Sequence, residues 1–404
     1  MREDWKYQPL GEITTSINGL WKGKKPPFVN VGVIRNANFT KEFTLNLSNI
    51  EYLDVEERQY SSRKLQRGDL IVEKSGGSEK QPVGRTILFD LEGEYSVSNF
   101  TSILRIKDKT SILPTFLYKY LLYIYKEGYT KEMQNATTGI HNIIYDKFLS
   151  IPIPILSLSE QERIVALLDA KFEKIDAIKA NAASQLQAAK DLFQSALKEV
   201  FEVNRNCKYE PLGEIVEIKR GLTYSKNDEV DISEKIVLRS NNVNLDNHQF
   251  DFTELKYLKP TFDIPADKYL QKGDLLMCMS NGSKAHLGKV ALYEGESDKY
   301  AFGGFMAALS HKDSVIGRYL FYAMITPMYK EYIKTLSDGA NINNLKVRDI
   351  EAFSIPVPPL PEQERIAASL DAISEKVKAL QANYDNTITL CNDLKQSLLK
   401  SIFA

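Results

Sequence analysis

The chain has 404 residues, 43% of them hydrophobic and 26% charged, with a formal net charge of −1. This composition is ordinary for a globular protein of two or three domains, and no apolar run reaches the roughly 18–20 residues that a membrane helix needs. The balanced charge gives no general basic excess for binding nucleic acid, and three widely spaced cysteines with a charged N-terminus favour a cytoplasmic protein without disulfides.

The first part of the chain reads as a mixed α/β domain that opens with Tyr-Gln-Pro-Leu-Gly-Glu-Ile at 7–13. Residues 114–125 begin with proline and are rich in Leu, Tyr and Lys, which predicts a helix with Pro in its first turn. The Ile-Pro-Ile-Pro segment at 151–154 is predicted to be extended. Short β-branched or aromatic runs between Gly, Asn or Pro predict strands at 28–34, 69–72, 86–89 and 95–106.

A long helix is predicted from residue 159 onward, where Ser159 and Glu162 have the spacing of a capping box. About 40 residues at 1.5 Å each give a helix of roughly 60 Å. Apolar side chains recur over 36 positions (200 − 164) in ten steps, a mean of 3.6, which is the period of a straight helix. They are Ile164, Leu168, Phe172, Ile175, Ile178, Ala182, Leu186, Ala189, Phe193, Leu197 and Val200.

The remaining chain repeats this plan from the Tyr-Glu-Pro-Leu-Gly-Glu-Ile segment at 209–215. Residues 315–325 predict a helix, Ile-Pro-Val-Pro at 355–358 an extended connector, and Pro361 the first turn of a second long helix. Strands are predicted at 236–239, 274–279, 289–293 and 301–309. The apolar series of the second long helix is Ile366, Leu370, Ile373, Val377, Leu380, Tyr384, Ile388, Cys391, Leu394, Leu398 and Ile402.

The two long helices match without insertion, since the offset is 202 both at their starts (362 − 160) and at their ends (403 − 201). An apolar stripe must be covered, which favours an antiparallel helix pair, with packing of each helix on its own domain as the alternative. We therefore predict an α+β fold with two similar mixed α/β domains, two long antiparallel helices and a pseudo-twofold repeat. The predicted boundaries are 1–158 for the first domain, 159–203 for the first helix, 204–360 for the second domain and 361–404 for the second helix.

No catalytic, metal or nucleotide site stands out in the sequence. Lys25-Pro26-Pro27-Phe28 resembles a loop of amino-group methyltransferases, but its first residue must accept a hydrogen bond and lysine cannot. Gly19 to Lys24 lacks the length and the Ser/Thr of a phosphate loop and reads as a basic loop. The four histidines have no metal-ligand spacing. We expect no catalytic residues, no metal and no cofactor on this chain.

Polar loops at two matched positions of the repeat are the candidates for binding. Asn and Arg side chains can pair with base edges, while Ser, Gly and Lys suit the approach to phosphates. The alternative is that these residues form ordinary solvated turns. The predicted DNA-binding residues are Arg35, Asn36, Asn38, Lys74, Ser75, Ser78, Lys80, Arg85, Arg239, Asn241, Asn242, Asn244, Ser280, Asn281, Ser283, Lys284 and Lys289.

Over nearly all of its length the chain resembles the specificity subunits of type I restriction-modification systems. The resemblance rests on the doubled order of Pro-Leu-Gly-Glu-Ile, Gly-Asp-Leu (68–70 and 273–275), Ile-Pro-x-Pro and Glu-Gln-Glu-Arg segments. It implies a non-catalytic subunit in which each domain reads half of a bipartite target in double-stranded DNA and the helices set the spacing.

The resemblance also implies partners: two methyltransferase subunits that carry S-adenosylmethionine and modify adenine N6, and restriction subunits that use ATP and magnesium. The helix starts are expected to serve capping and partner contacts, through Glu160, Gln161, Arg163, Glu362, Gln363 and Arg365. A specificity subunit of a related type II system and a duplicated protein-binding scaffold are the alternatives. No membrane association is expected.

Overall fold

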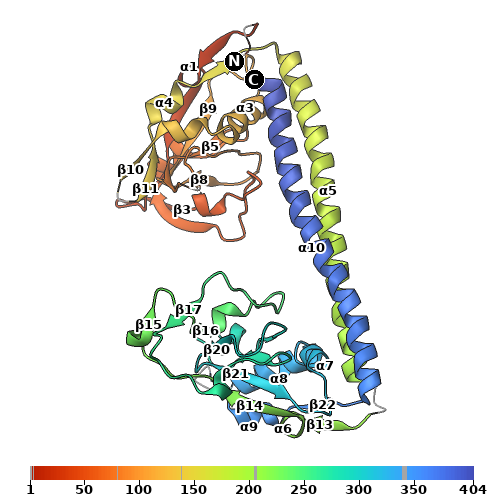
Figure 1. The fold of residues 1–404 in the computed structure, drawn as a ribbon. Helices are drawn as coiled ribbons and strands as arrows, with labels where there is room; N and C mark the ends of the chain where they lie inside the picture. The colour runs from red at the N-terminus through yellow and green to blue at the C-terminus, as the bar shows by residue number, and fades with distance from the viewer. Residues whose placement is uncertain (1, 3, 80, 138, 204–206, 339–343) are drawn as a thin grey trace. The chain divides into compact units, whose positions relative to one another are not determined.

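The computed structural model describes residues 2, 4–79, 81–137, 139–203, 207–338 and 344–404. They form two compact units: unit 1 is Met1–Ala182 with Asp385–Ala404, and unit 2 is Ala183–Tyr384. Each unit holds a mixed domain and parts of two long helices, α5 (Leu158–Lys198) and α10 (Leu360–Phe403) (Figure 1). The α+β fold predicted from the repeat is confirmed.

The domain of unit 1 is built around a four-stranded antiparallel sheet in the order β2-β9-β5-β7. All four residues of β5, Leu-Ile-Val-Glu, are buried because this strand has neighbours on both sides. The strands are β1 Tyr7–Pro9, β2 Thr14–Asn18, β3 Phe28–Ile34, β4 Glu51–Glu56, β5 Leu70–Glu73, β6 Ser75–Gly77, β7 Thr86–Leu88, β8 Tyr95–Val97, β9 Thr101–Ile106, β10 Gln134–Thr137, β11 Ile140–Ile143 and β12 Pro152–Pro154. The shorter helices are α1 Leu10–Ile13, α2 Glu57–Arg63, α3 Pro114–Lys126 and α4 Tyr145–Leu149.

Unit 2 follows the same plan, with a central sheet in the order β14-β21-β18-β19. Its central strand β18, Leu-Leu-Met-Cys, is again buried throughout. The strands are β13 Tyr209–Pro211, β14 Val216–Arg220, β15 Glu229–Val230, β16 Ile236–Leu238, β17 Lys256–Leu258, β18 Leu275–Cys278, β19 Val290–Leu292, β20 Tyr300–Phe302, β21 Met306–His311 and β22 Ser354–Pro356. The shorter helices are α6 Leu212–Ile215, α7 Gly317–Ala323, α8 Pro327–Asp338 and α9 Val347–Glu351.

Two predicted strands are interrupted, and at the same place in each unit. Residues 95–106 and 301–309 were each predicted as one strand, but a turn separates β8 from β9 and β20 from β21. The break is needed because the chain changes sheets there. β8 and β20 pair in parallel with β3 and β16, whereas β9 and β21 belong to the central antiparallel sheets.

The extended Ile-Pro connectors are edge partners of the first strand of each domain. β12 pairs with β1 and β22 pairs with β13, both antiparallel. Each connector leads from a domain into a long helix. The pairing holds the connector against the first strand of that domain.

In unit 1 the early residues of α5 lie against the late residues of α10, as the predicted antiparallel pairing requires. The thiol of Cys391 contacts the carbonyl oxygen of Ile175 at 3.9 Å, and Lys395 Nζ lies 2.6 Å from Asp176 Oδ1. Side chains at the start of α5 and at the end of α10 also pack in the core of the domain. The alternative prediction, that each helix packs on a domain, therefore holds at these helix ends.

In unit 2 the late residues of α5 lie against the early residues of α10. Leu197 and Phe201, at the end of α5 and in the π-helical turn Glu199–Val203, share one core with Ile366 and Leu370 at the start of α10. This core is also antiparallel in its helix contacts, and it includes side chains of α7 and α8.

The covered stripe of the long helices matches the predicted one except at one position in each helix. Ile178 and Leu394 are exposed, while Lys179 and Lys395 are partly buried. In α5 the covered positions advance by alternating steps of four and three, through Leu168, Phe172, Ile175, Lys179, Ala182, Leu186, Ala189 and Phe193. In α10 they advance by seven, through Leu370, Val377, Tyr384, Cys391 and Leu398. The covered positions therefore follow a heptad of period 3.5.

Candidate nucleic-acid interface

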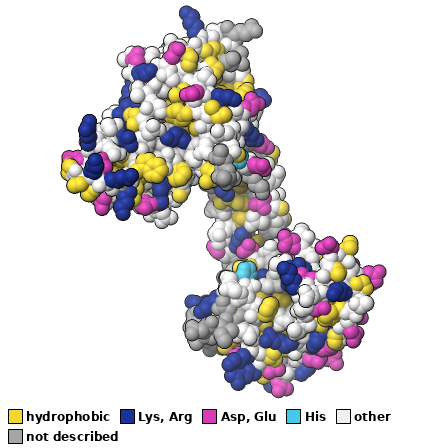
Figure 2. All heavy atoms as spheres, turned by 90° about the vertical axis from the view of Figure 1, so that its left-hand side faces the viewer, with side chains coloured by type: hydrophobic (Ala, Val, Ile, Leu, Met, Phe, Trp, Pro, Cys, Tyr) yellow, Lys and Arg dark blue, Asp and Glu magenta, His cyan; other side chains and the backbone are white. Residues whose placement is uncertain are grey.

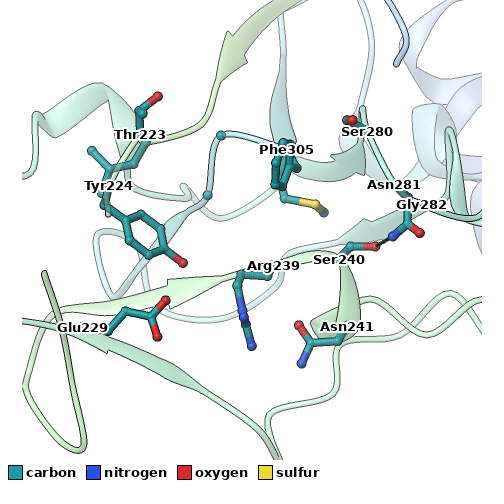
Figure 3. Close-up of a pocket in the computed structure, with 14 residues that line it drawn as sticks. Thr223, Tyr224, Glu229, Arg239, Ser240, Asn241, Ser280, Asn281, Gly282 and Phe305 are labelled. Carbon is teal, nitrogen blue, oxygen red and sulfur yellow. Dashed lines mark hydrogen bonds between the residues drawn. The ribbon is translucent and has the colours of Figure 1, made fainter. Parts of the chain in front are cut away.

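A surface groove of about 630 Å³ lies in unit 2 where the loops after β14, β16 and β18 meet the turn before β21 (Figure 3). Four of the predicted DNA-binding residues line it, namely Arg239, Asn241, Ser280 and Asn281. The structure thus brings together two loops that lie about 40 positions apart in the sequence (281 − 241). Asn281 Nδ2 donates to Ser240 Oγ at 2.8 Å and joins the two loops.

The matched loops of unit 1 are also joined by an asparagine, here from the first loop to the main chain of the second. Asn36 Nδ2 donates to the carbonyl oxygen of Ser75 at 2.6 Å. Ser75 Oγ lies 2.5 Å from Asn142 Oδ1, and Lys74 Nζ donates to Asn18 Oδ1 at 2.8 Å. Burial lowers the pKa of Lys74, and the nearby Arg63 charge lowers it further.

Asn38 and Asn242 hold the turns that present these loops. Each side chain is 1% exposed, and each Oδ1 accepts from the backbone N–H of Arg35 or Arg239 at 2.9 Å. Asn38 Nδ2 donates to the carbonyl oxygen of Asn46, and Asn242 Nδ2 donates to those of Asp251 and Glu254. Their amides are used inside the domain, so we revise their predicted role from a direct base contact to positioning the turn.

Arg85 and Lys289 also act inside their domains. Arg85 makes a buried, bidentate ion pair with Glu73, with distances of 2.7 and 3.1 Å. Lys289 Nζ donates to the carbonyl oxygens of Ser240 and Val243 at 2.7 and 2.6 Å, and burial lowers its pKa. The predicted phosphate contacts are corrected for both residues, because their charged groups already have partners beneath the loops.

The remaining predicted residues lie on the surface or at its edge. Asn241, Ser78, Ser283 and Lys284 are exposed. Ser78 Oγ accepts from the N–H of Gln81, Asn244 Oδ1 accepts from Asp246, Asn281 Oδ1 accepts from Ser283, and Lys284 Nζ donates to Ser337. Arg35 pairs with Glu51. Lys80 lies outside the described residues.

Several buried polar atoms at these loops have no hydrogen-bond partner among the described residues. They are Arg35 Nε and Asn36 Oδ1 in unit 1 and Arg239 Nε in unit 2. Buried polar atoms are normally paired, so these loops retain hydrogen-bonding capacity that other residues of the domain do not use.

Aromatic and acidic side chains at the groove were not anticipated from the sequence. Tyr224, Glu229 and Phe305 line it, and Glu229 is paired with Lys256 at 2.7 Å. In unit 1 the residue that matches Phe305 is Phe100 (305 − 100 = 205, the offset of the preceding strands). The Gly303-Gly304 pair before Phe305 was the available signal, since two glycines inside a strand pattern indicate a break.

Basic and aromatic side chains also gather on unit 1. Lys22, Lys24 and Lys25 lie in an exposed loop with Trp21 and Phe28. Figure 2 shows lysine and arginine side chains lying among hydrophobic ones on this unit. The basic loop expected between Gly19 and Lys24 is therefore on the surface.

The helix starts carry a duplicated joint made by two fully buried glutamines. Gln161 Oε1 accepts from the N–H of Leu113 at 2.8 Å, and its Nε2 donates to the carbonyl oxygens of Ser111 and Leu156, both at 2.9 Å. Gln363 repeats this pattern with Ile316 N–H and the carbonyl oxygens of Ser314 and Pro358, at 3.0, 2.9 and 2.8 Å. All six bonds join a glutamine side chain to main-chain atoms.

The charged residues beside these glutamines face solvent. Glu160 with Arg163, and Glu362 with Arg365, form bidentate pairs one helical turn apart. The arginine holds the pKa of each glutamate below its ordinary value. The predicted cap is two residues too late, since Ser157, not Ser159, accepts from the N–H of Glu160.

Within the described ranges, no group of three His, Cys, Asp or Glu side chains has the arrangement of a metal site. Among the helices in those ranges, none is long and apolar enough to cross a membrane.

A family model described as the type I restriction modification DNA specificity domain matches residues 2–188 and again residues 204–390. The chain belongs to this family. Its two matched segments correspond to the two copies of the repeat, so each unit of the fold contains one domain that carries the candidate loops.

Curated relatives carry the same description. The type I restriction enzyme EcoKI specificity subunit of Escherichia coli (strain K12) is 29% identical over 192 residues, which cover 47% of this chain and 40% of that protein. The putative type I restriction enzyme MjaX specificity subunit of Methanocaldococcus jannaschii is 22% identical over 387 residues, covering 93% of this chain and 88% of the relative. The match to the EcoKI subunit thus spans less than half of its length.

Two solved structures share the fold. One, from work on the complex assembly and conformational transition of the type I R-M system, aligns with a TM-score of 0.75 at 21% identity and covers 100% of this chain and 98% of its own. The HsdS subunit from Thermoanaerobacter tengcongensis aligns with a TM-score of 0.53 at 20% identity, covering 100% and 97%.

Proposed function

We propose that this chain is the DNA-specificity subunit of a type I restriction-modification enzyme, with each unit reading one half of a bipartite target in double-stranded DNA. The observation that carries the proposal is the pair of matched polar loops, joined by an asparagine in each unit and lined in unit 2 by Arg239, Asn241 and Asn281. Arginine and asparagine can form bidentate hydrogen bonds with guanine and adenine in the major groove.

The chemistry of modification and cleavage belongs, in this proposal, to partner subunits in the cytoplasm. Two methyltransferase subunits would bind S-adenosylmethionine and modify adenine N6, and restriction subunits would use ATP and magnesium. The chain itself contributes recognition and no catalytic residue. The exposed charged pairs at the starts of α5 and α10 are available for contacts with these partners.

The spacing between the half-sites is proposed to depend on α5 and α10. Each is continuous, with 41 and 44 residues, and contains no proline after its first turn. A helix of about 40 residues is roughly 60 Å long and keeps its length without a hinge.

Methylome sequencing tests the proposal directly. The chain is produced with its methyltransferase partner in a host without other adenine methylation, and the modified sites are mapped. We expect one motif with two specified parts separated by a gap of fixed length. Methylation without such a motif would contradict the proposal.

Asn241→Ala should alter recognition in one half-site only. Loss of a bidentate base contact costs about 1–3 kcal/mol of discrimination at one base pair. Asn247→Ala is the matched control, because Asn247 is an exposed asparagine of the same unit that does not line the groove. An equal loss of binding on all DNA would instead indicate a phosphate contact at Asn241.

A further inference from the structure

Both units present a phenylalanine to solvent at the same place in the fold. Phe100 is 47% exposed and Phe305 is 71% exposed, each at the end of the turn that leads into β9 or β21 of the central sheet. A phenyl ring usually buries most of its surface in a core. An exposed ring at one matched position invites an explanation by binding.

The backbone of each turn is fixed by the same hydrogen bonds. The N–H groups of Lys74 and Ser75 donate to the carbonyl oxygen of Phe100 at 2.8 and 3.2 Å. The N–H groups of Met279 and Ser280 donate to that of Phe305 at 2.8 and 3.1 Å. The carbonyls are thereby tied to the loops that carry the predicted DNA-binding residues, so the main chain that bears each ring is held against those loops.

The flanking residues of the two turns differ while the aromatic ring is kept. Ser98-Asn99 precedes Phe100, and Gly303-Gly304 precedes Phe305. Each turn is closed by a bond from the residue after the phenylalanine, Thr101 or Met306, to the carbonyl three positions earlier, at 3.0 and 2.8 Å. The shared elements are therefore the ring and its anchoring.

The surroundings of Phe305 are polar. It shares the groove with Arg239, Asn241 and Asn281, whose side chains carry hydrogen-bonding groups (Figure 3). An apolar ring among such groups suits a ligand that is mostly polar and has an isolated apolar feature. In the major groove of DNA that feature is the 5-methyl group of thymine, to which phenylalanine can pack.

We propose that Phe305 and Phe100 each recognise thymine in their own half-site by packing against its 5-methyl group. The inference rests on the proposed function and adds to it a specificity contact made without hydrogen bonds. A half-site that contains an adenine to be methylated also contains the thymine paired with it.

Uracil substitution tests the contact, because it removes only the methyl group. Once the half-sites are known, each thymine is replaced in turn by uracil in a duplex, and binding to the chain in complex with its methyltransferase partner is measured. At one thymine in each half-site we expect affinity to fall about threefold to tenfold, the effect of one methyl group that is no longer buried. If no thymine-to-uracil change weakens binding, the inference is wrong.

The variant Phe305→Ala tests which phenylalanine contacts the thymine of which half-site. This variant should bind the thymine duplex more weakly, by at least the factor that uracil substitution costs the unchanged protein. Uracil in the half-site read by unit 2 should then have no further effect on its binding, while uracil in the other half-site should still weaken it. Phe100→Ala should show the reverse pattern. A variant that keeps the sensitivity to uracil of the unchanged protein would overturn the proposal.

Phe252→Ala is the matched control, since this exposed ring of unit 2 lines a different cavity beside Arg318 and Asp371. It should retain the full response to uracil. If the unchanged complex shows no sequence-dependent binding, the proposed function fails. If it binds selectively but Phe305→Ala behaves like the unchanged protein, only the thymine contact fails.

Discussion

Gln161 and Gln363 show how one residue can fix the direction in which a long helix leaves a domain. Each side chain uses both ends of its amide, accepting one backbone N–H and donating to two carbonyl oxygens. Because the amides are fully buried, the backbone groups that they satisfy have no water to replace them.

The first prediction concerns this joint. Gln363→Leu leaves one N–H and two carbonyl oxygens without their partner and should lower the free energy of unfolding by about 2–4 kcal/mol. Urea denaturation followed by circular dichroism measures the loss. Glu362→Gln, which breaks only an exposed ion pair, should leave it nearly unchanged. A Gln363→Leu variant as stable as the control would contradict the proposed joint.

Residue type predicted the chemistry of the loops better than it predicted which side chains face solvent. Asn38, Asn242, Arg85 and Lys289 were reasonable choices for DNA contacts, yet all four satisfy groups inside their domains. Nothing in the local sequence distinguishes Asn241 from its buried neighbour Asn242. Burial there depends on bonds to residues 251 and 254, which local patterns do not contain.

At the scale of elements, the end of α10 is an integral part of unit 1. Phe403 is buried among Trp5, Phe116, Tyr120 and Tyr123, with ring centroids 5.3 to 6.5 Å apart. The last helical turn thus completes an aromatic cluster whose other rings come from the N-terminal domain of unit 1.

Phe403→Ala should therefore destabilise unit 1 by about 3–5 kcal/mol, the usual cost of removing a fully buried phenyl ring. Leu394→Ala, at an exposed position of the same helix, is the control and should cost less than about 0.5 kcal/mol. Thermal unfolding of the two variants provides the comparison. Equal melting temperatures would show that the helix end is not needed for the core.

The long helices were predictable in position but not in the finer period of their covered stripe. The predicted series included Ile178 and Leu394, which are exposed, in place of Lys179 and Lys395, which are partly buried. In the structure Lys395 lies over the ring of Phe172 at 5.0 Å and pairs with Asp176, so its stem is covered while its charge is satisfied. A charged side chain can hold a position in the stripe, which an apolar count misses.

The strand breaks before Phe100 and Phe305 were missed for a different reason. Residues 95–106 are apolar enough to read as one strand, and only pairing with two different sheets forces the turn. The order of strands and helices could be predicted from the sequence, whereas the exchange between sheets required the full topology.

At the scale of the whole molecule, the helices are proposed to set the gap between half-sites. Removing one heptad from each, residues 180–186 and 380–386, preserves the 3.5-residue repeat of covered positions. The deletion shortens each helix by about 10 Å, so the methylated motif should lose about three base pairs of its gap and keep both half-sites. Methylome sequencing of the variant measures the gap.

A matched deletion of three residues from each helix is the control for this prediction. It breaks the heptad and should reduce the stability of the helix pair and hence the level of methylation. If the seven-residue deletion leaves an active enzyme with an unchanged gap, the helices do not determine the spacing.

The glutamine joint has a consequence for how new specificities could arise. On the domain side, Gln161 and Gln363 bind only main-chain atoms, those of Leu113, Ser111, Ile316 and Ser314. Such a joint is indifferent to the side chains of the domain that it holds. A domain of the same backbone that kept the apolar residues packed on the helix ends could be exchanged by recombination and would form the same glutamine bonds. Under the proposed function, such an exchange would change one half of the recognised target in one genetic step.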